Sequence, residues 1–282
     1  CISPVYLLDG ASIVTIEVLK TEHGPNEIQK KMTDCFGSQC GFCTPGFVVA
    51  MAAMFECHKK VDSSKIKNFT TGNLCRCTGY EPIISAGLAV DAAKLEPLSR
   101  RYLTPHIRSA LAAVSRAEFE IKTPEKHVFG PTKVSQISTL LKKNKSCRIV
   151  SAATDLGVQY NKEKIELEKT LTLHHIPSLF EISVTKKTVR IGAKVSLATI
   201  QENLTEELPV FCRFLNVFAS PQIRNVATLV GNIANASPIG DTLPYLFVAG
   251  ATLVIQGPKA TREVLINDFY KGYKKTDLRP GE

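Results

Sequence analysis

Residues 1–22 alternate apolar and polar side chains, unlike most of the chain that follows. An Asp-Gly pair at positions 9–10 divides this segment into two short alternating runs, a pattern that predicts a β-hairpin. An isolated two-stranded hairpin is too small to fold alone in water. We therefore expect residues 1–22 to depend on a larger domain.

From Gly24 to about Lys94, the apolar residues no longer alternate with polar ones but recur with the spacing of a helix. Ile28, Met32 and Cys35 stand four and three residues apart, so they share one face of a predicted helix. The segment is expected to form a compact helical module.

Two dipeptides ending in proline predict further helix starts within this module. Thr44-Pro45 is typical of an N-cap followed by proline at the first helical position, and it precedes the all-apolar stretch Phe47–Phe55. Glu81-Pro82 repeats the arrangement for a helix that should run to about Leu95. Because a helix that is apolar on all sides is usually buried, we expect the helix containing Phe47–Phe55 to lie inside the module.

The second half of the chain alternates strand-like with helix-like segments, which predicts an α/β or α+β domain. The expected strands are Phe119–Ile121, Cys147–Val150, Thr170–Leu173, Thr188–Ile191 and Thr252–Ile255, and the expected helices are Val134–Lys142, Leu197–Leu204, Val210–Phe218 and Thr242–Ala249. We therefore predict an α+β chain with boundaries at 1–22, 23–96, 97–118 (a linker) and 119–282.

Composition and length add limits to this picture. With 282 residues, 44% of them hydrophobic and 22% charged, the chain resembles a soluble globular protein of two ordinary domains. The longest apolar run, Gly46–Phe55, has about half the length that a membrane-spanning helix requires, and the sequence shows no signal peptide. We expect no membrane association and a cytoplasmic location.

The formal charge of +9 is spread thinly along the chain. It lacks the basic blocks and interleaved aromatic residues of nucleic-acid binders, so no nucleic acid is expected. The charge favours anionic cofactors or an acidic partner. Because the first residue is Cys rather than Met and residues 278–282 resemble a turn before another strand, we expect a piece of a longer chain.

Four of the nine cysteines occur in two pairs. Cys40 and Cys43 form C-x2-C, and Cys75 and Cys77 form C-x-C after 31 intervening residues. Four thiolates can hold a 2Fe-2S cluster or a structural zinc ion. The C-x-C pair and the apolar helix behind C-x2-C depart from the repeated C-x2-C of zinc ribbons, although zinc remains the alternative.

The remaining titratable candidates are expected to be structural. The isolated cysteines should be small buried hydrophobic residues, and the histidines should lie at the surface, with no partner pattern for a general base. These residues are Cys35, Cys57, Cys147 and Cys212, and His58, His106, His127, His174 and His175.

The cysteine pairs lie in two longer motifs, GSQCGFCTPGF at 37–47 and GNLCRCTGY at 72–80. Both resemble the helical 2Fe-2S domain of the xanthine dehydrogenase and aldehyde oxidase family of molybdenum hydroxylases. The resemblance implies that the four cysteines, Cys40, Cys43, Cys75 and Cys77, bind the cluster nearest the molybdenum cofactor. It also implies that Gln39 contacts the pterin, and a loop cap is the structural alternative for this residue.

The first five residues, CISPV, resemble the last part of the family's ferredoxin-like domain. The resemblance implies that Cys1 is the final ligand of a plant-type cluster. The C-x4-C-x2-C ligands that should precede it are not among these 282 residues, so another segment would have to supply them.

Two stretches resemble the family's FAD-binding loops: IVSAATDL at 149–156, and FASPQIRNVATLVGNI at 218–233 continuing to ASPIGD at 236–241. Small residues allow consecutive backbone N–H groups to approach a diphosphate. The resemblance implies a domain of the vanillyl-alcohol-oxidase (PCMH) type. It assigns cofactor binding to Ile149, Val150, Ser151, Ala152, Ala153, Thr154, Asp155, Leu156, Phe218, Thr228, Gly231, Asn232 and Asp241.

Several of these residues have structural alternatives. The family often has glycine at the position of Ala152, and a positive φ there would cost alanine roughly 1 kcal/mol. Asp155 and Asp241 are also candidate helix N-caps, the latter for a helix beginning at Thr242. A phenylalanine such as Phe218 is more often a core residue than a flavin-stacking one, so the resemblance alone assigns it to the cofactor.

The resemblance implies an electron-transfer subunit with no catalytic side chain of its own. Electrons would pass from molybdopterin in a partner large subunit through 2Fe-2S to FAD and on to NAD+, during oxidation of hypoxanthine or xanthine to urate in a hetero-oligomer. The alternatives are the same relay in an aldehyde, nicotine or carbon monoxide oxidising relative, or a zinc-stabilised interaction module without catalysis.

Overall fold

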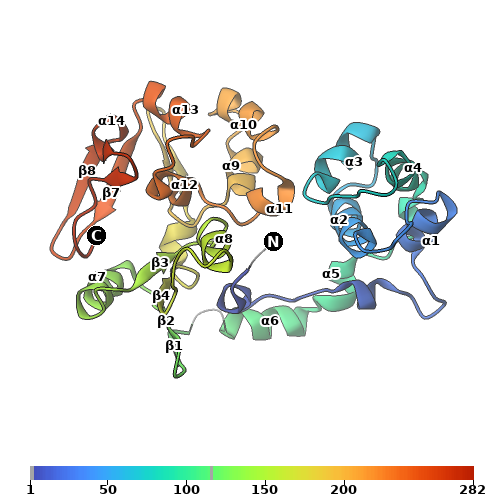
Figure 1. The fold of residues 1–282 in the computed structure, drawn as a ribbon, viewed down its shortest axis with the longest axis horizontal. Helices are drawn as coiled ribbons and strands as arrows, with labels where there is room; N and C mark the ends of the chain where they lie inside the picture. The colour runs from blue at the N-terminus through green and yellow to red at the C-terminus, as the bar shows by residue number, and fades with distance from the viewer. Residues whose placement is uncertain (1–2, 115–116) are drawn as a thin grey trace. The chain divides into compact units, whose positions relative to one another are not determined.

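The structure is a computed structural model that describes residues 3–114 and 117–282. The chain divides into two compact units, drawn in Figure 1, each with its own hydrophobic core. Unit 1 consists of Cys1–Asp9, Ser115–Ala219 and Ile223–Glu282, and unit 2 consists of Gly10–Val114 and Ser220–Gln222. Among the described helices, none has the length and apolar character needed to cross a membrane.

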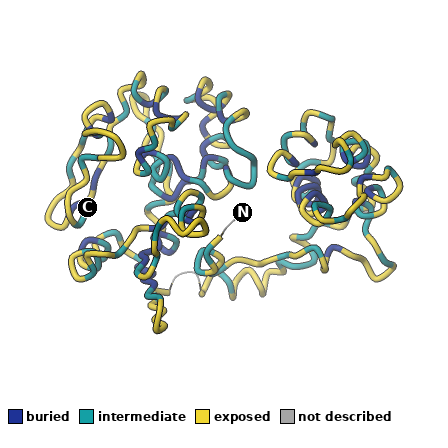
Figure 2. The backbone as a smooth tube through the Cα atoms, viewed as in Figure 1, coloured by how far each residue is buried: buried dark blue, intermediate teal, exposed yellow. Residues whose placement is uncertain are grey.

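Unit 2 is helical. Its helices are η2 (Ile16–Leu19), α1 (Glu27–Asp34), α2 (Thr44–Cys57), α3 (Ser63–Thr70), α4 (Glu81–Ala89), η3 (Ala92–Lys94), α5 (Leu98–Tyr102) and α6 (Pro105–Val114), where η denotes a 3-10 helix. Figure 2 shows buried residues concentrated along α2. Met51 and Met54 of this helix and Ile66 of α3 have no exposed surface, so α2 forms the centre of this core.

Side-chain caps explain where two of these helices begin. Asn26 and Gln29 form a capping box at α1, because the Asn26 Oδ1 accepts the Gln29 N–H at 2.9 Å and the Gln29 Oε1 accepts the Asn26 N–H at 2.8 Å. Asp62 Oδ1 accepts the Lys65 N–H at 2.7 Å and caps α3. The caps satisfy N–H groups that have no partner inside the helix.

The predicted N-terminal hairpin is wrong. Residues 5–8 and 16–19 form the 3-10 helices η1 and η2, although Gly10 does lie in a turn, with φ of +76°. In a 3-10 helix, residues three apart share one side. Ile16 and Leu19 therefore reach the core of unit 2 without a strand, and Leu19 is buried there.

Two predicted helix ends also differ from the structure. Cys43 is the N-cap of α2, so Thr44 is already helical and Pro45 follows it within the first turn. The helix that was expected to reach Leu95 ends at Ala89, since Val90 is extended and Asp91 is the N-cap of the separate helix η3.

Unit 1 mixes strands and helices, which confirms the α+β prediction. Its strands are β1 (Phe119–Lys122), β2 (His127–Gly130), β3 (Arg148–Val150), β4 (Lys169–Thr172), β5 (Ile182–Val184), β6 (Val189–Ile191), β7 (Thr252–Gln256), β8 (Thr261–Leu265), β9 (Tyr270–Gly272) and β10 (Lys275–Thr276). Its helices are η1 (Val5–Leu8), α7 (Val134–Lys143), α8 (Leu156–Asn161), η4 (Pro177–Phe180), α9 (Leu197–Asn203), α10 (Pro209–Leu215), α11 (Pro221–Arg224), α12 (Leu229–Asn235), α13 (Leu243–Val248) and α14 (Ile266–Phe269), although the first two residues of α11 belong to unit 2.

The largest sheet of unit 1 has the strand order β1-β2-β4-β3. Strand β4 is central and pairs in parallel with both neighbours: Val128 lies opposite Thr170, and Ile149 lies opposite Leu171. Leu171 has no exposed surface and lies in the core of this sheet. The sheet therefore delivers the end of β3 to a fixed place beside β4.

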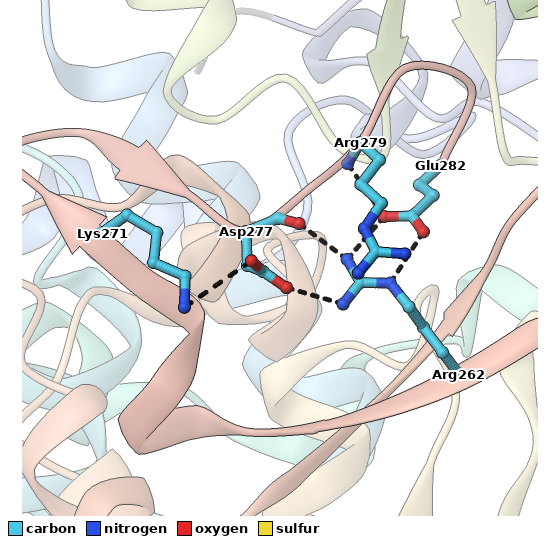
Figure 3. Close-up of polar contacts among 5 residues, drawn as sticks. All are labelled: Arg262, Lys271, Asp277, Arg279 and Glu282. Atoms are coloured by element: carbon cyan, nitrogen blue, oxygen red, sulfur yellow. Dashed lines mark hydrogen bonds and ion pairs between the residues drawn. The ribbon is translucent and has the colours of Figure 1, made fainter.

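An ion-pair cluster ties β8 to the last described residues, as Figure 3 shows. Arg262 donates two 2.7 Å hydrogen bonds to the Glu282 carboxylate and one of 2.6 Å to Asp277 Oδ2. Lys271 lies 3.6 Å from the other Asp277 oxygen. These contacts raise the pKa of Arg262 and lower the pKa of Asp277 and of Glu282. The bidentate hydrogen bonding of Arg262 to the Glu282 carboxylate is the stronger geometry for an arginine–carboxylate ion pair.

Candidate iron-sulfur and flavin sites

The structure brings the two cysteine loops of unit 2 together. The sulfur atoms of Cys40 and Cys77 are 3.5 Å apart, and the thiols of Cys43 and Cys75 interact with each other. Each pair takes one cysteine from each loop. Among the described residues, no group of three or more His, Cys, Asp or Glu side chains is placed to hold a metal ion, so the four cysteines meet as two pairs rather than as one set of three or four ligands.

Hydrogen bonds within these loops favour the thiolate form of two cysteines. The Thr78 side chain, 3.1 Å from the Cys75 sulfur, is the main cause that lowers the pKa of Cys75 to about 7. The backbone N–H of Phe42 is the main cause that lowers the pKa of Cys40. Burial raises the pKa of Cys43, and the hydrogen bond to Cys40 raises that of Cys77. Thiolates are the ligand form of cysteine, so the lowered pKa of one member of each pair favours metal binding.

The backbone of the two loops has conformations that few side chains tolerate. Gly41 and Gly79 have φ of +84° and +70°, in the region that glycine adopts without cost. Tyr80 also has a positive φ of 71°, and its hydroxyl accepts the Cys75 N–H at 3.2 Å. The loops are thus held by glycine turns and by Tyr80 rather than by regular structure.

The residues beside the cysteines are exposed. Phe42 is 95% exposed and Leu74 is 82% exposed, and Gln39 is exposed next to Cys40. Large apolar side chains at such exposure, grouped near a candidate site, mark a surface suited to a partner.

The candidate flavin site of unit 1 forms where β3 ends. Val150 is its last strand residue, and loop 151–155 leads into α8. Ser151 Oγ lies 3.2 Å from Thr228 Oγ1, so the two loops that resemble FAD-binding segments meet. Thr228 also forms a bridge with Ser196, which fixes it from the other side.

Loop 151–155 carries backbone N–H groups without a protein acceptor. Within the described part of the chain, the N–H groups of residues 152–155 donate no hydrogen bond, although Ala152 and Ala153 are buried. Ala153 has φ of +61°, a left-handed conformation of the kind that gathers successive N–H groups into an anion-binding concavity. This donor set fits the diphosphate of FAD.

Thr228 and Asn232 build the second loop of this site. Thr228 Oγ1 accepts the Gly231 N–H at 3.0 Å and caps α12. A Cβ on Gly231 would lie only 2.8 Å from that oxygen, so glycine is needed at this position. Asn232 Oδ1 accepts a 2.6 Å hydrogen bond from Thr242 Oγ1, which joins α12 to the start of α13.

Three expectations about the flavin-site residues need correction. The positive φ falls on Ala153, not on Ala152. Thr242, not Asp241, is the N-cap of α13, and Asp241 is exposed. Asp155 does precede α8, but its carboxylate accepts from the Gln159 side chain instead of a backbone N–H. Each difference depends on the local backbone path, which the residue types alone leave open.

The other flavin-site candidates have the following places. Ile149 and Val150 are in β3, Thr154 is half-buried in the loop, and Leu156 is the first residue of α8. Phe218 packs against the larger core of unit 1, with its ring 5.4 Å from that of Phe214, so the structure gives it a core contact.

Sequence reasoning missed two buried cations of this region. Lys194 Nζ donates to the Ser151 carbonyl at 2.7 Å, and Arg224 Nη1 donates to the carbonyls of Phe218 and Ala219 at 3.0 and 2.8 Å. Burial lowers the pKa of Lys194 to about 8 and also lowers that of Arg224. A lone lysine in the short, otherwise apolar run from Ile191 to Val195 was an available signal.

Histidine and cysteine burial also departs from expectation. His175 is only 3% exposed: its Nδ1 lies 2.7 Å from the Ala117 carbonyl, and the Asp9 carboxylate lies 3.1 Å from its Nε2, outside hydrogen-bond geometry. Cys57 is exposed instead of buried. Cys1, the predicted ligand of a second cluster, lies outside the described residues.

Comparisons with known proteins match the two parts of the chain to two cofactor-binding domains. Residues 118–282 match the model of the FAD binding domain in molybdopterin dehydrogenase, and residues 15–88 match that of the [2Fe-2S] binding domain. The chain therefore belongs to the family of molybdopterin dehydrogenase FAD-binding domains, and it joins such a domain to a 2Fe-2S-binding one.

Among particular relatives, a xanthine dehydrogenase of Oryza sativa subsp. japonica is 28% identical over the whole chain, and an aldehyde oxidase 1 of Bos taurus is 27% identical. The chain spans only 26% and 25% of those proteins. It is thus similar to one part of much longer oxidoreductases.

Solved structures show a similar fold over part of the chain. A carbon monoxide dehydrogenase from Oligotropha carboxidovorans is 26% identical, with a TM-score of 0.53 over 57% of both chains. Quinoline 2-oxidoreductase from Pseudomonas putida 86, at 24% identity and a TM-score of 0.54 over 57% of both chains, supports the fold alone.

Proposed function

We propose that this chain is the electron-transfer part of a molybdenum hydroxylase. Electrons would enter from a molybdopterin centre in a partner, pass through a 2Fe-2S cluster in unit 2, reach FAD in unit 1 and leave to NAD+. The observation that carries the proposal is the pairing of cysteines from two distant loops, with 3.5 Å between the sulfurs of Cys40 and Cys77.

The four paired cysteines suit a two-iron cluster because they form two pairs. In a 2Fe-2S cluster with four cysteine ligands, two thiolates serve each iron. Cys40 with Cys77 and Cys43 with Cys75 would then each hold one iron. The N–H groups of this loop, such as that of Phe42, would stabilise the sulfur charge and help set the cluster potential.

The flavin site would hold FAD by its diphosphate. Loop 151–155 offers N–H groups without protein acceptors, and Thr228 closes the site from the second loop. FAD, when bound, accepts electrons singly and delivers them as a pair to NAD+. The chain itself needs no general acid or base for this task, and its residues serve to bind and orient the cofactors.

The exposed residues around the cysteines suit the docking of the molybdopterin-binding partner. Phe42 and Leu74 would be buried by that partner, and Gln39 would reach the pterin. The relatives are named for xanthine, aldehyde, carbon monoxide and quinoline chemistry, which is consistent with a substrate chosen in the partner. We favour hypoxanthine and xanthine because the relatives that match the whole chain include several xanthine dehydrogenases.

Metal analysis with a visible spectrum tests the proposal. The purified chain should contain iron and inorganic sulfide in equal amounts and absorb at about 450 nm as flavoproteins do. A colourless protein with a single zinc ion would overturn it in favour of a structural module. Co-purification with a molybdenum-containing protein and reduction of NAD+ by xanthine would test the partner and the substrate separately.

A further inference from the structure

Lys194 is a buried ammonium group in the segment between β6 and α9, and it is 9% exposed. Its Nζ donates to the Ser151 carbonyl at 2.7 Å and lies 5.7 Å from the centre of the Phe180 ring. In residues 3–114 and 117–282, no carboxylate lies within ion-pair distance of Nζ. The charge therefore has no anionic partner in this part of the protein.

Burying an unpaired charge is unfavourable, and the side chain responds by losing its proton more easily. Burial lowers the pKa of Lys194 to about 8, so the group stays mostly charged at neutral pH. A neutral side chain such as glutamine could also donate to a carbonyl. The Ser151 carbonyl and the Phe180 ring stabilise the ammonium group only in part, so an anionic ligand nearby would explain why a lysine stands here.

The Ser151 carbonyl determines where the following N–H points. In a trans peptide the C=O and N–H bonds are antiparallel, and the described chain has no cis peptide bond. Because the Ser151 carbonyl faces Lys194, the N–H of Ala152 faces the opposite side of the loop. That N–H is the first of the donors that lack a protein acceptor.

We propose that Lys194 is a positioning residue for the diphosphate of FAD: its ammonium fixes the Ser151 peptide so that the N–H groups of loop 151–155 face the ligand, and it places a positive charge behind them. The inference rests on the proposed function only in naming FAD as the ligand. The chemistry requires a diphosphate, which FAD and ADP share and riboflavin lacks.

The first test compares ligands on the full chain after removal of flavin. Lys194→Met should weaken FAD and ADP binding by about tenfold or more, since a hydrogen bond and a charge are lost, and should leave riboflavin binding within about twofold. Lys187→Met, at an exposed lysine of the β5–β6 turn, is the control and should change none of the three. Flavin fluorescence and calorimetry give the dissociation constants, and circular dichroism checks folding.

A pH series on the same proteins separates charge from packing. An anionic ligand favours charged Lys194, so the affinity of the wild-type chain for FAD and ADP should fall as the pH rises from 7 to 9, through the pKa near 8. Lys194→Arg stays charged over this range and should bind with little pH dependence. This comparison remains decisive if the methionine variant fails to fold.

The outcomes distinguish the two proposals. If the wild-type chain binds FAD but Lys194→Met binds it equally well, or if the pH dependence is the same in the arginine variant, the role of Lys194 is refuted while the flavin site stands. If the wild-type chain binds neither FAD nor ADP, the proposed flavin function is refuted. Equal weakening of riboflavin would also overturn the role in diphosphate binding.

Discussion

The two candidate cofactor sites use different atoms of the chain. In unit 2 the cluster site is a set of side-chain sulfur atoms on loops, and Cys40 and Cys77 are exposed. In unit 1 the flavin site consists mainly of backbone N–H groups in a loop where Ala152 and Ala153 are buried. The first site depends on which residues are present, and the second depends on how the backbone is bent.

The difference predicts how each site should respond to mutation. Replacing one ligand atom should destroy the cluster site, because no other side chain can take the place of a thiolate. The flavin site should tolerate many side-chain changes but respond to changes in backbone conformation or nearby charge. The following predictions test this contrast.

The largest effect should come from Cys43→Ser. Loss of one thiolate from the Cys43 and Cys75 pair should abolish the visible and paramagnetic signals of the cluster, while FAD remains bound in unit 1. Cys57→Ser removes an exposed thiol outside the two loops and should leave both cofactors in place. Loss of FAD together with the cluster would contradict the separation of the two sites.

Core truncations should separate the stabilities of the units. Met51→Ala and Leu171→Ala each remove a side chain with no exposed surface, and each should cost about 2–5 kcal/mol of unfolding free energy. Met51→Ala should lower the denaturant concentration at which half of the cluster signal is lost. Leu171→Ala should lower the denaturant concentration at which half of the FAD is released. The contrast fails if either variant shifts both midpoints equally.

Glycine substitutions at adjacent positions of loop 151–155 should have opposite signs. Ala153→Gly relieves a left-handed alanine and should raise the unfolding free energy of unit 1 by about 0.5 kcal/mol, because relief of strain exceeds the extra entropy of the unfolded chain together with the loss of a buried methyl group. Ala152→Gly has no such strain to relieve, so the entropic cost and the loss of a buried methyl group should lower it by about 1 kcal/mol. Chemical denaturation of the two variants in parallel measures the two changes in unfolding free energy. If both changes have the same sign, the left-handed backbone does not lie at Ala153.

The smallest effect should be that of low pH on the stability contributed by the ion-pair cluster around Arg262. The pKa values of Asp277 and Glu282 are lowered in the folded chain, so their contribution is present at neutral pH and is lost as the pH falls below about 4.5. Arg262→Gln should therefore lower the melting temperature at pH 7 but make little difference at pH 3. An equal difference at both values would mean that Arg262 acts by packing alone.

Much of the fold of unit 1 could be predicted where apolar residues form a distinct run. The strand β4 and the amphipathic helix α7 have such patterns, and the structure contains both near the predicted bounds. The missed strands are β2, β5, β8, β9 and β10, and two of them show why: β2 follows a polar turn and ends at Gly130, and β5 has only three residues. β2 pairs in parallel with β4, which is distant in the sequence, whereas β5 pairs with the adjacent strand β6 and is missed only because it is short.

The cluster site was easier to predict than the flavin site. It consists of side chains that the sequence shows directly, whereas the flavin site consists mainly of backbone N–H groups. The spacing of Cys40, Cys43, Cys75 and Cys77 is visible in the sequence. The left-handed bend at Ala153 and the contact of Lys194 with Ser151 arise only when the end of β3 meets the segment after β6. No local pattern encodes that meeting, and the N-terminal alternation that suggested a hairpin shows how short patterns can mislead.

The contacts of His175 bear on how the flavin part could be produced in isolation. Its ring faces the Asp9 carboxylate and the Ala117 carbonyl, yet the family match begins at residue 118. A recombinant fragment cut at that boundary would retain the imidazole but neither of its oxygen neighbours. Soluble expression of the fragment should therefore require residues far upstream, supplied in the same polypeptide or as a separate peptide.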